Sequence, residues 1–185
     1  KLNPEIVSTA TYYDAAMASP ERICIDIMRD ASAANAHAHA LNYVSAVGAE
    51  GDTVTLHDEL SGETLTVTPK IVVNAAGPWI DFTNQALGKD TQFIGGTKGS
   101  HLVLDHPELR DSIQGREFFF ENKDGRIVLI YPLEDKILIG TSDIPIDNPS
   151  EARCTDEEIG YFLEMVRHVF PTIQVDRSHI VFKFS

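Results

Sequence analysis

The segment spanning residues 95–101, Gly-Gly-Thr-Lys-Gly-Ser-His, brings together side chains that could carry out acid–base chemistry. Its glycines allow unusual backbone angles, while Lys98, Ser100 and His101 supply a cation, a hydroxyl and a titratable base. Histidine has a resting pKa near neutrality, so it suits proton removal from an alcohol. A surface hairpin loop with a solvated lysine is the alternative. A P-loop is excluded because the glycine spacing is wrong and no helix is expected to follow.

A second candidate segment, residues 71–79, reads Ile-Val-Val-Asn-Ala-Ala-Gly-Pro-Trp. The apolar run predicts a strand covered on both faces at 71–74, and the small residues after it would let the backbone lie against a flat group or a phosphate. Pro78 can start a helix from Trp79 to Leu87, whose first N–H groups favour an anion. The alternative is a tight strand-to-helix turn that binds nothing.

The third candidate lies at 137–143, where an apolar strand ends in Gly-Thr-Ser-Asp. Placing Thr141 and Asp143 at the end of a strand is a common way of holding site groups on a rigid element. Alternatively, Asp143 caps the turn that follows. No metal site is predicted, because His37 and His39 are two residues apart on an expected helix and point in different directions.

Positioning these segments requires both helices and strands. Helical spacing of apolar residues predicts helices at 19–40 and 155–168, the second of which opens with a capping box. Alternating patterns separated by turn residues predict strands at 41–47, 53–60, 64–68, 92–104, 116–121, 126–131, 136–141 and 178–185. The expected fold class is α+β: an antiparallel or mixed sheet with helices, together with part of an α/β domain.

The composition sets limits on the class of protein. With 185 residues, 43% hydrophobic and 23% charged, the chain is typical of a soluble globular protein. Its net charge of −13 argues against a nucleic-acid partner. Cys24 and Cys154 form no metal or disulfide pattern, which favours a reducing, cytoplasmic setting, and Cys24 is predicted to lie in a core. The start at Lys1 and the strand that stops at Ser185 lead us to expect an internal fragment.

Taken together, these motifs resemble the flavin-dependent glycerol-3-phosphate dehydrogenases of the D-amino-acid-oxidase-like flavoprotein superfamily. Asn-Ala-Ala-Gly-Pro-Trp at 74–79 is found across that superfamily. Lys-Gly-Ser-His at 98–101, followed by Gly-Thr-Ser-Asp at 140–143, narrows the resemblance to the glycerol-3-phosphate enzymes. Tyr-Tyr-Asp at 12–14 and the closing strand at 180–185 also match, so the resemblance spans nearly the whole chain.

The resemblance implies where a cofactor and a substrate would lie. The cofactor-binding residues would be Val44, near the adenine end of FAD, and a turn that lies against the flavin, made of Ala75, Ala76, Gly77, Pro78 and Trp79. The substrate pocket would be bordered by Lys98, Gly99, Ser100, Thr141 and Asp143, with His101 as the catalytic residue that polarises the C2 hydroxyl. Residues 1–90 would then be a partial FAD-binding domain, and 91–185 a truncated substrate-binding (cap) domain.

The implied reaction is the oxidation of glycerol 3-phosphate to dihydroxyacetone phosphate by hydride transfer to FAD, with electrons passing to a quinone. The implied enzyme is a cytoplasmic protein, peripheral on the inner face of the cell membrane, and able to form a homodimer. No Gly-x-Gly-x-x-Gly fingerprint occurs in the sequence, and the substrate arginine of the family would follow Ser185. We therefore expect this chain alone to be inactive and to lack FAD.

Two other functions stay open. One is an FAD-dependent oxidase of an amine or a 2-hydroxy acid in the same superfamily, which would need less positive charge around its pocket than a phosphate ester requires. The other is a stand-alone, cofactor-free module that binds a small ligand. A dinucleotide-binding fingerprint upstream of Lys1 would exclude the stand-alone module.

Overall fold

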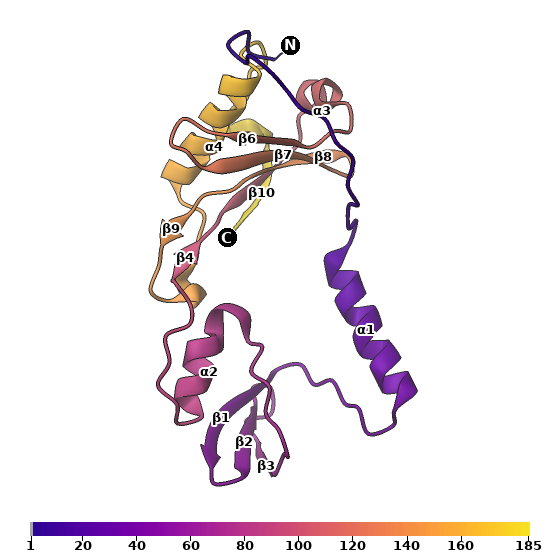
Figure 1. Cartoon of the computed structure of the whole chain (residues 1–185), viewed down its shortest axis with the longest axis vertical. Coiled ribbons are helices and arrows are strands. Elements are labelled where there is room, and N and C mark those ends of the chain that lie inside the picture. Colours follow the sequence, from indigo (N-terminus) through magenta and orange to yellow (C-terminus); the bar gives the residue numbers. More distant parts are fainter. Residues whose placement is uncertain (1) are drawn as a thin grey trace. The chain divides into compact units, whose positions relative to one another are not determined.

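The computed structural model describes residues 2–185, which form two compact units (Figure 1). One unit combines the N-terminal residues up to Thr9 with Gly95–Ser185, and the other is Ala10–Ile94. The combination of helices with antiparallel sheets confirms the predicted α+β class. The assignment of 1–90 to a cofactor domain and 91–185 to a substrate domain stays a prediction.

The larger unit is built on a five-stranded antiparallel sheet in the order β10-β5-β8-β7-β6. Its strands are β5 (His101–Leu104), β6 (Phe118–Glu121), β7 (Ile127–Leu133), β8 (Lys136–Gly140) and β10 (Ile180–Phe184). A separate two-stranded ladder pairs β4 (Thr97–Lys98) with β9 (Ile144–Pro145). The helices are α3 (Pro107–Ile113) and α4 (Asp156–Val169), with 3-10 turns η2 (Pro149–Glu151) and η3 (Arg177–His179).

One face of this sheet forms the hydrophobic core with α4. The side chains of Leu102 and Leu104 are fully buried, whereas the imidazole of His101, on the opposite face, is only partly covered. Side chains alternate between the two faces of a strand, so every second residue of β5, β7 and β8 enters the core. The core members from the sheet and from α4 are Leu102, Leu104, Val128, Ile130, Ile137, Ile139, Ile159, Phe162, Leu163, Met165, Val166 and Val169.

The helix α4 begins with the predicted capping box. The Thr155 hydroxyl accepts a hydrogen bond from the Glu158 N–H at 3.3 Å, and the Glu158 carboxylate accepts one from the Thr155 N–H at 2.8 Å. Two of the N–H groups that a helix start leaves without partners are thereby satisfied. At the other end, the N–H of Asn3 donates to the carbonyl of Val169 at 2.8 Å. The predicted helix and its apolar stripe are confirmed.

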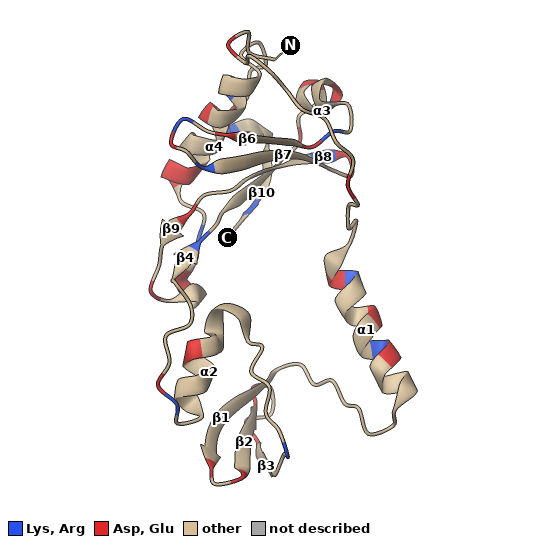
Figure 2. Cartoon of the chain, viewed as in Figure 1, with Lys and Arg blue, Asp and Glu red and all other residues tan. Residues whose placement is uncertain are grey.

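The smaller unit contains a three-stranded antiparallel sheet, β1 (Val44–Glu50), β2 (Thr53–Asp58) and β3 (Thr64–Val67), in sequential order. It also contains α1 (Pro20–Ala34), the 3-10 turn η1 (Gly77–Trp79) and α2 (Ile80–Ala86). Acidic and basic residues both lie on α1 (Figure 2). The helix predicted from Trp79 to Leu87 is confirmed to within one residue at each end.

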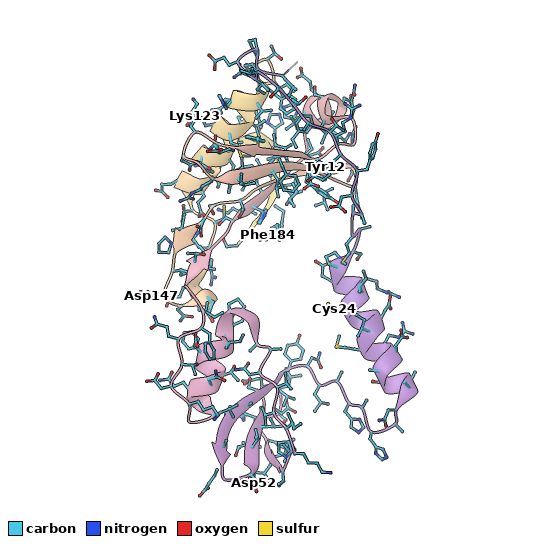
Figure 3. All side chains as sticks on the ribbon, in the orientation of Figure 1. Tyr12, Cys24, Asp52, Lys123, Asp147 and Phe184 are labelled. Carbon is cyan, nitrogen blue, oxygen red and sulfur yellow. The ribbon has the colours of Figure 1, made fainter. Side chains whose placement is uncertain are left out.

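Three predictions for the smaller unit are wrong. Residues 71–74 form no strand, and the side chains of Ile71 and Val73 are 80% and 82% exposed. Cys24, labelled in Figure 3, is exposed rather than part of a core. An apolar run becomes a buried strand only when neighbouring strands or helices cover it, and none of the described strands pairs with 71–74. Similarly, α1 buries none of its residues and ends at Ala34 rather than at 40.

None of the helices within residues 2–185 combines the length and the apolar character needed to cross a membrane. Within the same residues, no cluster of histidine, cysteine or acidic side chains is arranged to hold a metal ion.

Candidate functional site

Lys98, predicted to be a cation of the substrate pocket, is already paired with a carboxylate. Its Nζ atom lies 2.5 Å from Oε2 of Glu158 and donates to the carbonyl of Arg153 at 2.5 Å. The side chain of Lys98 is 9% exposed and that of Glu158 is 3% exposed. The positive charge of Lys98 is therefore largely neutralised within the protein, so it does not face solvent as an open phosphate-binding group.

Glu158 is the residue that sequence reasoning missed. Besides Lys98, its carboxylate accepts hydrogen bonds from the Thr155 N–H and, at 2.5 Å, from the Ser142 hydroxyl. Burial raises the pKa of Glu158, but hydrogen bonds from Lys98, Ser142, the Thr155 N–H and Ser100 outweigh burial and lower the pKa from 4.5 to about 2. The capping-box pattern signalled this residue only as a helix start, since the pattern carries no information about partners outside the helix.

Ser100 connects this buried cluster to the strand that carries His101. Its N–H donates to the Ser142 hydroxyl at 2.8 Å, and its own hydroxyl lies 2.5 Å from that of Ser185. Ser100 is fully buried and Ser142 is 4% exposed. Two of the segments singled out in the sequence, 98–101 and 140–143, are therefore brought together.

Gly99 lies where these two segments cross. A Cβ atom placed on Gly99 would lie 2.5 Å from Oγ1 of Thr141 and 3.1 Å from the carbonyl of Ser142. A glycine is required because any side chain would separate the segments. The Thr141 hydroxyl donates to the Ser142 carbonyl at 3.1 Å, and Asp143 is exposed.

His101 lies at the start of β5 between Gly140 of β8 and Phe184 of β10, with which it is in register. Its imidazole stacks on the ring of Phe184, with centroids 5.1 Å apart and planes inclined by 13°. Figure 3 labels Phe184 at the end of β10. Burial lowers the pKa of His101 from its ordinary value of 6.5, so the imidazole is neutral at neutral pH. Its Nδ1 atom is buried and has no hydrogen-bond partner among residues 2–185.

The sheet face that carries His101 is apolar and is open along β10, whereas Val103 on the same face is buried. Residues directly opposite each other on paired strands share a face, and the pairing of Val103 with Phe182 therefore places Phe182 on the same face as His101. The rings of Phe182 and Phe184 are 61% and 41% exposed. An exposed apolar surface next to a partly covered imidazole is suited to covering a flat, partly apolar group.

The turn at Ala75–Trp79 is organised by Asn74, a residue outside the predicted cofactor-binding set. The Asn74 amide donates to the carbonyl of Ile80 at 2.9 Å and to Oδ1 of Asn84 at 2.7 Å, and its oxygen accepts from the Ala76 N–H at 3.1 Å. Gly77 has a φ of +55°, and a Cβ atom there would meet nothing within 4 Å. The turn is therefore held by Asn74 and has free space beside the Cα atom of Gly77.

The predicted site residues thus fall into two groups, one in each compact unit. The larger unit contains Lys98, Gly99, Ser100, His101, Thr141 and Asp143, and the smaller unit contains Val44 and Ala75–Trp79. Val44, the first residue of β1, is half-buried and pairs with Asp58. The open backbone turn around Gly77 leaves room for a flat group such as FAD, although the fingerprint that would hold the pyrophosphate is not in this sequence.

Comparison with known families identifies the chain. Residues 1–183 match the DAO family, described as FAD dependent oxidoreductase. The chain belongs to this family. Within the family it is similar to the aerobic glycerol-3-phosphate dehydrogenases of two Staphylococcus aureus strains, MRSA252 and USA300, with 31% identity over 178 residues in each. The alignment covers 91% of this chain and 31% of each relative. The chain thus spans about a third of the length of the curated relatives it matches.

The fold is also similar to that of a protein of known structure. The glycerol-3-phosphate dehydrogenase from Bacillus halodurans, in a crystal structure complexed with FAD, has 30% sequence identity and a TM-score of 0.67. The likeness covers 78% of this chain and 30% of that enzyme. The family resemblance identified from the motifs is confirmed.

Proposed function

We propose that this chain is part of an FAD-dependent dehydrogenase that oxidises sn-glycerol 3-phosphate to dihydroxyacetone phosphate. The observation that carries the proposal is the environment of His101, a neutral, half-covered imidazole stacked on Phe184 at the open apolar face of a rigid sheet. The named function of the relatives, which share 31% identity over 91% of this chain, supports the choice of substrate.

The chemistry follows from the state of the imidazole. FAD would supply the two-electron acceptor, taking a hydride from C2 of the substrate. The hydroxyl proton would pass to Nε2 of His101, which has a free lone pair in the neutral tautomer that carries its hydrogen on the buried Nδ1, and the lowered pKa keeps the ring neutral. Loss of one hydride and one proton converts the secondary alcohol to a ketone, so atoms and charges balance. The exposed rings of Phe182 and Phe184 would exclude water from the reacting carbon.

The remaining predicted residues take supporting places in this proposal. The substrate pocket is shaped by Gly99, Ser100, Thr141 and Asp143. Lys98 stabilises this part of the pocket through its ion pair with Glu158. The substrate phosphate needs arginine or lysine groups that are not already neutralised, and the proposal places these outside this chain. Val44 and the turn Ala75–Trp79 would contact FAD, with the open side of Gly77 toward the flavin.

We further propose that the whole enzyme passes its electrons to a quinone, lies in the cytoplasm against the inner face of the cell membrane, and forms a homodimer. A quinone resides in the lipid phase, so peripheral attachment would bring donor and acceptor together. The two cysteines of the chain are free, which suits a reducing compartment. Quinone reduction by washed membranes that contain the enzyme, and its loss on stripping the enzyme from them, would test this assignment.

The deciding experiment is substrate-dependent reduction of an artificial electron acceptor by the purified whole protein that carries this chain. We expect a yellow protein that turns over with glycerol 3-phosphate and not with D-amino acids or 2-hydroxy acids. A yellow protein active only with an amine or a 2-hydroxy acid would favour the other superfamily reaction. A colourless protein that binds no flavin when FAD is added would reject the enzyme proposal.

A further inference from the structure

We propose that Glu158 is a positioning residue for His101. Through hydrogen bonds, its carboxylate links the segment before β5 and the segment after β8 to the first turn of α4. Besides Ser100, the groups that it binds come from Lys98, Ser142 and Thr155, which belong to different parts of the larger unit. The catalytic consequence rests on the proposed function, whereas the positioning itself can be measured without turnover.

The direction of the hydrogen bonds follows from the charge of Glu158. An ionised carboxylate can only accept hydrogen bonds, so the Ser142 hydroxyl must donate its proton to Oε1 of Glu158. The oxygen of Ser142 then has its lone pairs free, and it accepts the N–H of Ser100 at 2.8 Å. The negative charge on Glu158 therefore fixes the donor and acceptor roles in the hydrogen bonds that run from Glu158 through Ser142 to Ser100. If the carboxylate were protonated or neutralised, these roles would no longer be fixed.

The hydrogen bonds reach the chain neighbours of both stacked residues. Ser100 precedes His101, and Ser185 follows Phe184, while the two serine hydroxyls lie 2.5 Å apart. The hydrogen bonds thus hold the backbone on each side of the rings that stack at 5.1 Å. Fixing these two neighbours restricts how far the imidazole of His101 can move away from Phe184.

A purely stabilising role is a poorer explanation of this cluster. Burying an ion pair such as Lys98–Glu158 costs desolvation free energy that its attraction often only offsets, and apolar residues of similar volume can serve stability as well or better. A paired and hydrogen-bonded carboxylate instead specifies one arrangement of its partners. Ser100, Ser142 and Glu158 are all at most 4% exposed, so solvent cannot replace the contacts without opening the structure.

The test compares Glu158→Gln with Glu157→Gln in the whole protein. Gln has almost the same shape as Glu but lacks the charge, and Glu157 is an exposed neighbour in the same helical turn, so the control removes one negative charge without touching the cluster. The first readout is the pKa of the His101 imidazole, followed by NMR of ¹³C-labelled histidine. The His101 resonance is assigned by its loss in His101→Gln.

We expect the pKa of His101 to rise toward 6.5 in Glu158→Gln and to stay unchanged in Glu157→Gln, because a loosened imidazole becomes better hydrated. Removing a negative charge would by itself lower a histidine pKa. A pKa shift caused by lost positioning and one caused by the lost charge therefore have opposite signs. An unchanged or lowered pKa in Glu158→Gln would overturn the proposal. Ser142→Ala, which interrupts the same path without a change of charge, should give the same rise, and it decides the question if Glu158→Gln does not fold.

The second readout is the turnover number per bound flavin with glycerol 3-phosphate. Displacing a catalytic group by about 1 Å costs about 100-fold, so we expect kcat in Glu158→Gln to fall by about 10- to 100-fold while flavin content is kept. A kcat equal to that of Glu157→Gln would also overturn the proposal. An unmutated protein that is folded but has no activity would reject the proposed function, and the NMR readout would still decide the positioning.

Discussion

The imidazole of His101 lies over Gly140, its register partner on the neighbouring strand, so closely that a Cβ atom on Gly140 would overlap the ring. The absence of a side chain at Gly140 thus determines where the candidate catalytic group can lie. This relationship joins two residues that lie on separate strands, in segments singled out for different reasons.

Replacing Gly140 by alanine should therefore displace His101 and reduce turnover by about 10- to 100-fold, with flavin content unchanged. The measurement is kcat per bound flavin in the whole protein. Gly160→Ala is the matched control, because Gly160 is an exposed residue within α4 and a Cβ atom there meets nothing within 4 Å. The control should be more stable by about 0.5–1 kcal/mol. Normal turnover in Gly140→Ala would show that the position of the ring is not important.

The pH dependence of kcat/KM should report the neutral form of His101. Burial lowers the pKa of this residue below 6.5, so the base stays neutral at neutral pH and activity is lost only as the pH falls through the lowered pKa. His101→Gln should reduce kcat strongly and remove this acidic limb from the profile, while leaving flavin binding intact. An acidic limb that persists in His101→Gln would assign it to another group and remove His101 from the catalytic role.

The Glu158 carboxylate should make the stability of this chain depend on pH. Its folded-state pKa of about 2 lies below the ordinary 4.5, so the stabilisation is present above 4.5 and is lost as the pH falls toward 2. The difference corresponds to on the order of 3 kcal/mol. Urea unfolding between pH 6 and 2 should show a smaller acid-induced loss for Glu158→Gln than for Glu157→Gln. Equal losses would mean that Glu158 has an ordinary pKa in the folded chain.

Asn74 should control flavin retention through the turn that it organises. Asn74→Ala removes the contacts to Ile80, Asn84 and Ala76, at a cost of about 1–3 kcal/mol for the groups left without partners. We expect a lower ratio of flavin to protein after gel filtration. Asn74→Asp keeps the acceptor for the Ala76 N–H but places a carboxylate oxygen opposite the oxygens of Ile80 and Asn84, so its flavin content should fall as well. Full flavin content in Asn74→Ala would contradict a cofactor role for this turn.

Local patterns predicted much of the larger unit because they depend on neighbours in sequence. The strands predicted at 116–121, 126–131 and 136–141 are present as β6, β7 and β8, and α4 starts at its predicted capping box. The strand predicted at 92–104 was wrong in its length: the chain forms only β4 and β5, which belong to different sheets, with Gly99 and Ser100 between them. Alternation cannot locate that break, because it depends on the close approach of Thr141 to Gly99.

The amino-acid sequence by itself determined the family, the α+β class and the two segments, 98–101 and 140–143, that form one side of the candidate site. These features depend on residue types and short spacings, which a sequence displays directly. The tertiary structure alone decided that Lys98 is neutralised by Glu158, a residue 60 positions away, and that His101 stacks on Phe184. Contacts between distant segments arise from strand order and packing, and no local pattern carries that information.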